Sequence, residues 1–288
     1  MNHILRIYFI GFFCFSYLMS NAQQGIFQPQ PGDYRDGVYD KENSDNRRLI
    51  PYTHLREADV TWEKRVWRKL DMREKQNQQL YFPKTYINGR ISLIQVLLKH
   101  ILAGDILAFK DEEFLQNLEL AEVRKKMVIQ NDSTDVEEML ADGSSVIVKK
   151  PGLTDSLWLL EKFVELDIKE DWFFDKQKSV LEVRILGLGV NALKPGKEEA
   201  GPIPQFWVYF PNCRRYFAKY EVYNSKNDSE RRTFEDIFWK RQFSSRATKE
   251  SNVFDRDIEN YSKGIDALLE SDRIKNDIFR WEHDLWHF

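Results

Sequence analysis

Two histidines near the end of the sequence have the spacing of a zinc site. The segment His283-Asp284-Leu285-Trp286-His287 resembles HExxH, in which two histidines one helical turn apart hold zinc and a glutamate activates water. Aspartate is one methylene shorter than glutamate, so its carboxylate would lie farther from the metal. A third ligand would have to come from a distant residue such as His54. We therefore favour a structural role for both histidines.

A second motif, Gly187-Leu188-Gly189-Val190-Asn191-Ala192, fits the GxGxxA pattern of dinucleotide-binding turns. Such a turn must open a helix whose N-terminal N–H groups face the pyrophosphate. Here Pro195 and Gly196 follow almost at once and prevent a helix from starting. We expect a bend that ends a strand.

Carboxylates are plentiful, as in Glu170, Asp171 and Asp175. An acid/base pair needs a specific separation across a cleft, which sequence spacing does not give. The sequence has no GxSxG motif, no P-loop and no Cys/His pair arranged for nucleophilic catalysis. We therefore expect a protein that is not an enzyme and that binds no cofactor and no metal.

Bulk composition limits the classes of partner. The 288 residues are 42% hydrophobic and 31% charged, enough to bury a substantial core. The net charge of −3 argues against nucleic acid, which normally needs a basic footprint. Aromatic residues make up 14% of the chain, with eight tryptophans. Such residues build cores, but they are also enriched at protein interfaces and sugar sites.

Residues 1–22 read as a secretory signal peptide. Arg6 supplies a short basic start, Ile7–Met19 is an apolar run of 13 residues, and Ala22 suits cleavage. The run is shorter than the roughly 20 residues that a spanning helix needs, so we expect an exported, soluble protein. Residues 23–50 form a polar extended arm that we expect to order on a partner. Cleavage leaves Cys213 alone, and we favour a buried, inert thiol over an intermolecular bridge.

The stretch Arg56–Pro83 is predicted to be a helix with two apolar faces. Ala58, Trp62, Val66 and Leu70 recur every four residues, as on a helix that packs against a core. Val60 and Trp67 point away from that row. We assign Trp62 to the core and expect the opposite face, with Trp67, to contact a second element or a partner.

The rest of the chain predicts an α+β fold, with a small, mainly antiparallel sheet and helices packed at the N-terminal and C-terminal parts. We expect a single domain over residues 51–288. Its expected elements are a buried helix at Ile91–Ala103 capped by Gly104 and containing a core histidine, His100; a strand at Ile106–Phe109; a helix at Phe114–Ile129; a solvated loop at Asn131–Ser144; a strand at Val146–Val148; a hairpin at Ile168–Leu188; a Pro/Gly loop at 194–204; a strand at Phe206–Phe210; and helices around Ile237 and from Ile258 to Leu285.

The chain resembles the GldN/PorN family of gliding-motility and type IX secretion proteins of Bacteroidetes. The READVxW start and the closing EHDLW are the most specific features. Four blocks carry the resemblance in the family's order: READVTWEKRVWRKLDMREKQNQQLYFP, IKEDWFFDKQKSVLEVRILGL, FWVYFPNCRRYFAKYEVYN, and the segment from FEDIFWKRQF to the closing EHDLWHF.

The resemblance implies a non-catalytic ring subunit in the periplasm, held at the inner face of the outer membrane by a lipoprotein partner, GldK/PorK. It also implies contact with copies of itself and with the periplasmic part of the motor protein GldM/PorM, and a requirement in protein secretion. Because tryptophan and arginine dominate interaction hot spots, the candidate partner-binding residues are Trp67, Trp172, Trp239, Trp286, Arg184, Arg214 and Arg215.

Two other functions stay open at this stage. The first is an exported carbohydrate-binding or hydrolytic module that uses aromatic stacking. The second is a metalloprotein built on His283 and His287.

Overall fold

The computed structural model describes residues 47–87, 89–127, 134–139, 145–150, 160–193, 199, 201–224, 227 and 229–284. All of them lie in one compact unit, Glu42–Phe288. The predicted signal peptide, nearly all of the arm, and Trp286 with His287 fall outside the described residues.

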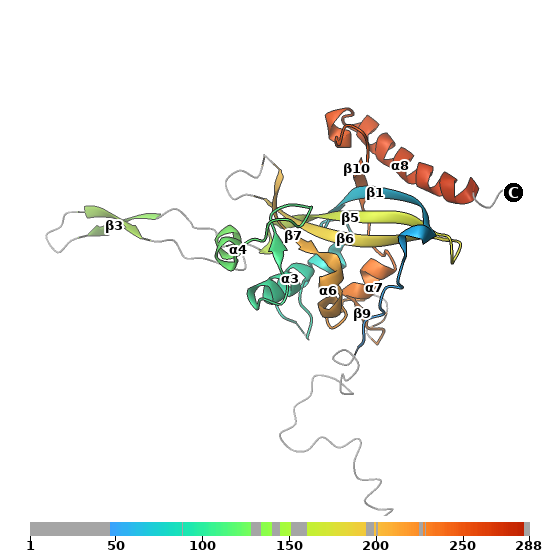
Figure 1. Ribbon diagram of the computed structural model, residues 1–288. Helices are drawn as coiled ribbons and strands as arrows, with labels where there is room; N and C mark the ends of the chain where they lie inside the picture. Colours follow the sequence, from blue (N-terminus) through green and yellow to red (C-terminus); the bar gives the residue numbers. More distant parts are fainter. Residues whose placement is uncertain are drawn as a thin grey trace, which may run out of the picture. The chain divides into compact units, whose positions relative to one another are not determined.

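A six-stranded antiparallel sheet forms the centre of the fold, and helices pack against it (Figure 1). Its order is β10-β1-β5-β6-β7-β2. The predicted α+β class is therefore confirmed. The strands of this sheet are β1 (Val60–Asp71), β2 (Ala108–Phe109), β5 (Phe163–Asp175), β6 (Val180–Leu193), β7 (Pro202–Tyr209) and β10 (Arg246–Glu250), and two small two-stranded sheets join β3 (Thr134–Met139) to β4 (Ser145–Lys150) and β8 (Glu221–Val222) to β9 (Arg232–Thr233).

The predicted helix at Arg56–Pro83 is wrong, because its central part, Val60–Asp71, is strand β1. A spacing of four residues keeps side chains on one face of a helix, but also on one face of a strand, because four is a multiple of the strand period of two. Trp62, Val66 and Leu70 satisfy both patterns. Only a short helix, α2 (Gln78–Tyr81), and a 3₁₀ turn, η1 (Glu57–Asp59), occur in this region.

Strand β1 lies inside the sheet, paired with β5 on one side and β10 on the other. Trp67 is half-buried rather than presented to solvent. Its indole Nε1 donates a hydrogen bond to Glu112 Oε2 at 2.7 Å. The ammonium groups of Lys249 and Lys169 lie 4.5 and 5.7 Å from its ring centroid. The Trp67 side chain is therefore held by contacts with other residues of the same chain.

The hairpin predicted at Ile168–Leu188 is confirmed and is longer than predicted, because β5 and β6 extend beyond it at both ends. Strand β6 continues through Gly187 and Gly189 to Leu193, so the predicted end of a strand there is wrong. A Cβ atom at Gly187 would lie 2.5 Å from the ring of Phe114, and one at Gly189 would lie 2.8 Å from the ring of Trp207. The glycines let aromatic rings lie directly on the strand.

Gly189→Ala is therefore expected to destabilise the protein by about 1–3 kcal/mol, the usual range for overpacking. The measurement is the free energy of unfolding in denaturant. Adding Trp207→Leu removes the whole indole ring that the new methyl group would strike. The double variant should lose less stability than the sum of the two single variants. Strict additivity would show that Trp207 is not the obstacle.

The larger hydrophobic core lies between the sheet and the helices α3 (Leu93–Leu102), α6 (Phe210–Phe217) and α7 (Phe234–Trp239) (Figure 1). Helix α3 confirms the predicted buried helix and its end at Gly104, which has a φ of +81°. His100 is a satisfied core histidine, as predicted: its ring nitrogens lie 2.9 Å from Asp105 Oδ2 and 3.1 Å from the Tyr220 hydroxyl.

A smaller core joins strands β1 and β10 to the long helix α8 (Ile265–Asp284). Ile274 and Ile278 of α8 pack with Val66 of β1. Trp62 is half-buried against this core, as predicted, and stacks on Trp281 with ring centroids 4.3 Å apart. Ile258 belongs to a separate 3₁₀ turn, η3 (Ile258–Asn260), so the predicted C-terminal helix begins later.

Three other predicted boundaries are corrected. The helix expected at Phe114–Ile129 is only α4 (Leu120–Met127), since Phe114 has a φ of 60° and Leu115 is exposed. The loop expected at Asn131–Ser144 contains strand β3, which pairs with β4. Within the expected loop 194–204, residues 202–204 already belong to β7 and pair with the end of β6. Proline is tolerated there because β2 pairs with β7 only at Trp207 and Val208, so residues 202–204 form an edge of the described sheet.

Candidate functional site

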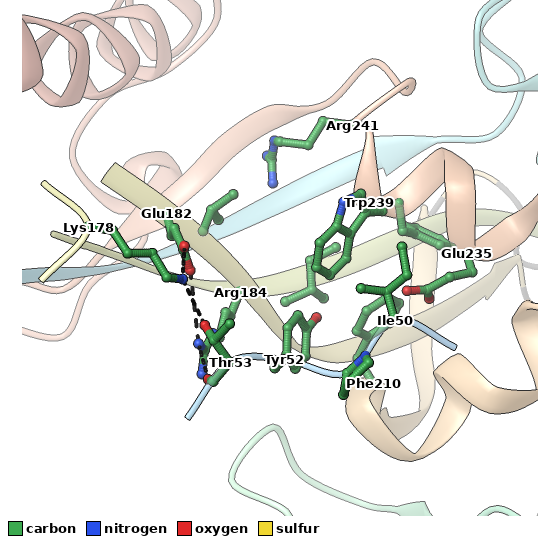
Figure 2. Close-up of a pocket in the computed structure, with 14 residues that line it drawn as sticks. Ile50, Tyr52, Thr53, Lys178, Glu182, Arg184, Phe210, Glu235, Trp239 and Arg241 are labelled. Carbon is green, nitrogen blue, oxygen red and sulfur yellow. Dashed lines mark hydrogen bonds and ion pairs between the residues drawn. The ribbon is translucent and has the colours of Figure 1, made fainter. Parts of the chain in front are cut away.

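A cleft of about 360 Å³ lies between the N-terminal segment of the described chain, the β5–β6 hairpin and α7 (Figure 2). We call Ile50–Thr53 the strap, because it crosses this cleft. The remaining lining residues come from the hairpin, α6, α7 and the residues after it: Lys178, Glu182, Val183, Arg184, Ile185, Phe210, Glu235, Phe238, Trp239 and Arg241.

Helix α7 holds the cleft side chains in place through a capping box. Thr233 Oγ1 accepts a hydrogen bond from the Asp236 N–H, and Asp236 Oδ2 accepts one from the Thr233 N–H. Phe234, Ile237 and Phe238 of the helix are buried in the larger core. The helix then presents Glu235 and Trp239 to the cleft.

The strap is tied to the body at both ends. Arg214 Nη2 donates to the carbonyl of Ile50 at 2.9 Å. Arg184 Nη2 donates to the carbonyl of Thr53 at 2.8 Å, and Lys178 Nζ donates to its hydroxyl at 2.8 Å. Between these ties the Tyr52 ring stacks on Trp239, with centroids 5.7 Å apart. The strap is thus an ordered wall of the cleft.

Arg214 and Glu235 form the buried ion pair beside this wall. The Arg214 side chain is 2% exposed. Its Nε and Nη2 both donate to Glu235 Oε1, at 2.8 and 2.6 Å. Its guanidinium carbon lies 3.8 Å from the centroid of the Tyr52 ring. Burial raises the pKa of Glu235, and the positive charge of Arg214 opposes that rise.

Two further guanidinium groups line the cleft between pairs of rings. Arg241 lies between Trp172 and Phe243, 5.1 and 5.3 Å from their centroids. It also donates to both carboxylate oxygens of the fully buried Glu170. Arg184 lies between Tyr52 and Phe173, 5.0 and 5.1 Å from their centroids. Both groups are held rigidly, because each is fixed by rings and by hydrogen bonds.

The structure brings together three of the seven residues predicted to bind a partner: Trp239, Arg184 and Arg214. Trp239 is 48% exposed. The sequence predicts that Arg214 contacts a partner, and the structure corrects this. The Arg214 side chain is buried and forms an ion pair with Glu235 inside the fold. Arg215, the next residue, is exposed and lies over the Tyr216 ring.

The other predicted tryptophans lie elsewhere. Trp172 packs against the smaller core, with its indole N–H on Glu170. Trp67 is engaged on β1, and Trp286 is outside the described residues. For the exposed residues of the set, contact with a partner stays a prediction.

Sequence reasoning missed Tyr52, Glu235, Arg241 and Lys178 as cleft residues. The Thr233-x-x-Asp236 pattern could have indicated the start of α7 and hence the position of Glu235. No local pattern marks Tyr52, which lies in an extended segment and reaches the cleft only through tertiary contacts.

The three carboxylates named from the sequence are each paired with a cation. Glu170 pairs with Arg241, Asp171 with Arg65 at 2.6 Å, and Asp175 with Lys178 at 3.7 Å. Within the described part of the chain, no three His, Cys, Asp or Glu side chains are grouped as metal ligands would be. This does not test the alternative of a metal site built on His283 and His287, since His287 lies outside that part. Among the described helices, none combines the length and the apolar character needed to cross a membrane.

Cys213 is buried in α6, and its Sγ lies 3.3 Å from the carbonyl oxygen of Tyr209. The predicted buried thiol is therefore confirmed. Burial raises the pKa of the Cys213 thiol far above its usual value, so the reactive thiolate is suppressed. We expect a thiol-reactive disulfide reagent at pH 8 to modify the native protein at least about a hundredfold more slowly than the unfolded protein. Equal rates would show that Cys213 is accessible.

The fold and the cleft together define an antiparallel α+β protein whose cleft arginines are locked by aromatic rings and structural carboxylates. The family comparison agrees with the resemblance seen in the sequence. The family model described as "Gliding motility associated protein GldN" matches residues 55–287, which is most of the chain. The chain belongs to this family and is thereby a gliding-motility protein, a part of a machinery rather than of an enzyme family. No curated protein matches it.

Proposed function

We propose that the protein is a non-catalytic ring subunit of the type IX secretion and gliding machinery. It acts in the periplasm, at the inner face of the outer membrane, where a GldK/PorK-like lipoprotein holds it. It also contacts copies of itself and the periplasmic part of a GldM/PorM-like motor protein, and secretion requires it. The observation that carries this proposal is the match of the GldN family over residues 55–287.

An exposed apolar surface near the start of α8 supports a role in assembly. We call it the α8 patch; its members are large hydrophobic residues with 42–97% of their surface exposed: Val253, Phe254, Tyr261, Ile265, Leu268 and Leu269. Arg256 links two of them, lying 4.9 Å from the Phe254 ring and 4.7 Å from the Tyr261 ring. Grouped exposed hydrophobic residues of this kind mark interaction surfaces.

A second group of exposed leucines lies near strand β2: Leu102, Leu107, Leu115 and Leu120. Strand β2 forms one edge of the main sheet, and β10, which packs against α8, forms the other. The two apolar surfaces therefore belong to opposite edges of the sheet. A ring built by rotation needs two different contact surfaces on each subunit, so two apolar surfaces at opposite edges support the proposal.

The carbohydrate alternative is less well supported by the cleft. A sugar stacks on the face of an aromatic ring that is free of other contacts. In the cleft, the Tyr52 ring of the strap already stacks on the Trp239 ring. The carboxylate of Glu235 is paired with Arg214 instead of facing a second carboxylate.

The test is deletion of the gene and complementation in the source bacterium. Deletion should abolish secretion by the type IX route, and the restored protein should co-purify with the lipoprotein in a large assembly. Crosslinking mass spectrometry on intact cells should place crosslinks near α8 and near β2. Normal secretion after deletion, or turnover of a substrate by the isolated protein, would contradict the proposal.

A further inference from the structure

We infer that the cleft binds a peptide from a partner protein through an apolar residue that lies next to a carboxylate. This rests on the proposed function, since a subunit that works by holding neighbours needs sites for their chains. The argument starts from three side chains that line the cleft, Arg184, Glu235 and Arg241. Each has one buried polar atom without a hydrogen-bond partner among the described residues: Arg184 Nε, Glu235 Oε2 and Arg241 Nη1.

The two arginine atoms call for an acceptor on the ligand. Buried N–H groups are almost always hydrogen-bonded, and leaving one unpaired is costly. Arg241 and Arg184 are each fixed between two rings, so their N–H groups are already oriented. A carboxylate is the acceptor that guanidinium binds best, because the hydrogen bonds are charge-assisted.

Glu235 Oε2 calls for a donor. Only Oε1 of this carboxylate receives the hydrogen bonds of Arg214, and the Glu235 residue is 9% exposed. A peptide amide N–H supplies a neutral donor of the right kind. A bare inorganic anion such as phosphate offers acceptors to the arginines but would be repelled by Glu235.

The apolar walls and the net charge of the cleft also limit which ligands fit it. Val183, Ile185, Phe210 and Phe238 give it apolar walls. The side chains that line the cleft include three cations and two anions, so their net charge is +1. The cations are Lys178, Arg184 and Arg241, and the anions are Glu182 and Glu235. A ligand with one negative charge, one amide and an apolar side chain matches that balance, and the cleft volume of about 360 Å³ suits one or two residues. Ligand sites of this kind combine apolar walls with a few placed polar groups.

The experiment titrates the full-length mature protein with two pairs of probes, followed by saturation-transfer NMR and calorimetry. N-acetyl-leucine is compared with N-acetyl-leucinamide, which lacks the carboxylate. N-acetyl-Leu-Glu-amide is compared with N-acetyl-Leu-Gln-amide, which lacks only the acidic side chain. At least one acid is expected to bind about tenfold or more tightly than its neutral counterpart, the usual effect of a charged hydrogen bond. Which acid binds tells whether the partner offers a chain end or an acidic side chain.

Arg184→Gln should weaken binding of the acid about tenfold more than it weakens binding of the neutral probe, because only the acid uses the charge of Arg184. The matched control is Arg65→Gln, because Arg65 and Arg184 lie opposite the same residue, Asp171, but Arg65 is outside the cleft lining. Since Arg241→Gln alone would leave Glu170 unpaired, it is combined with Glu170→Gln, and this double variant should also lose the preference for the acid.

Equal binding of acid and neutral probes, no binding of any probe, or unchanged binding by the Arg184→Gln variant would overturn the inference. These outcomes concern the cleft alone. The proposed ring function is tested by secretion after deletion, so a failure of one is distinguished from a failure of the other.

Discussion

Arg214→Ala is expected to destabilise the protein by about 3–5 kcal/mol, the cost of breaking a buried ion pair by removing one partner. Glu235 would be left unpaired in a buried position, because its only cationic hydrogen-bond donors among the described residues are on Arg214. The strap would also lose the hydrogen bond to the Ile50 carbonyl and the cation beneath Tyr52. The measurement is denaturant unfolding at neutral pH.

Arg215→Ala is the matched control, since it removes the same side chain one position later. Arg215 is exposed, and an exposed substitution of this kind usually changes stability by no more than about 0.5 kcal/mol. Two similar values for Arg214→Ala and Arg215→Ala would refute the structural role given to the buried pair. The double variant Arg214→Met with Glu235→Leu should recover much of the stability, since apolar replacement of a buried pair is often neutral.

The second large effect is expected on assembly rather than on stability. Leu269→Glu places a charge in the α8 patch, at a side chain that is 61% exposed. The isolated protein should fold normally, because the buried side of α8 is carried by Ile274 and Ile278. If the patch is an interface and Leu269 is one of its hot spots, losing this side chain costs about 2 kcal/mol or more. Recovery of the large assembly and secretion should then fall about thirtyfold or more.

Asn276→Glu adds the same charge to an exposed position farther along α8. It should leave assembly and secretion intact. A matching loss in both variants would point to the charge of the helix as a whole, and intact assembly with Leu269→Glu would remove the α8 patch from the interface. Melting temperature and circular dichroism of both variants separate a folding defect from an assembly defect.

Long segments with a clear period could be predicted from the sequence. The hairpin of β5 and β6 alternates apolar and polar residues over many positions, with turn residues between the strands. Helix α3 is apolar over most of its circumference and is closed by Gly104. In both cases local propensity and the required burial agree, so one conformation is strongly favoured.

Strand β1 shows where that reasoning fails. Its apolar residues recur at intervals of four, which helix and strand both satisfy, so the pattern does not discriminate. What selects the strand is pairing with β5 and β10, whose residues lie about a hundred positions or more away in the chain. The same holds for Gly187 and Gly189: their role follows from the rings of Phe114 and Trp207, which only the folded chain brings to them.

The sequence by itself determined the α+β class, the buried thiol and the family, because these depend on composition, on local period and on blocks of specific residues. The cleft was decided by the tertiary structure. Arg214 was predicted to face a partner, but the fold places it under a strap 164 positions earlier in the chain and against Glu235. The physical reason is that a charge's role depends on which groups surround it after folding, and contacts at that separation leave no local pattern in the sequence.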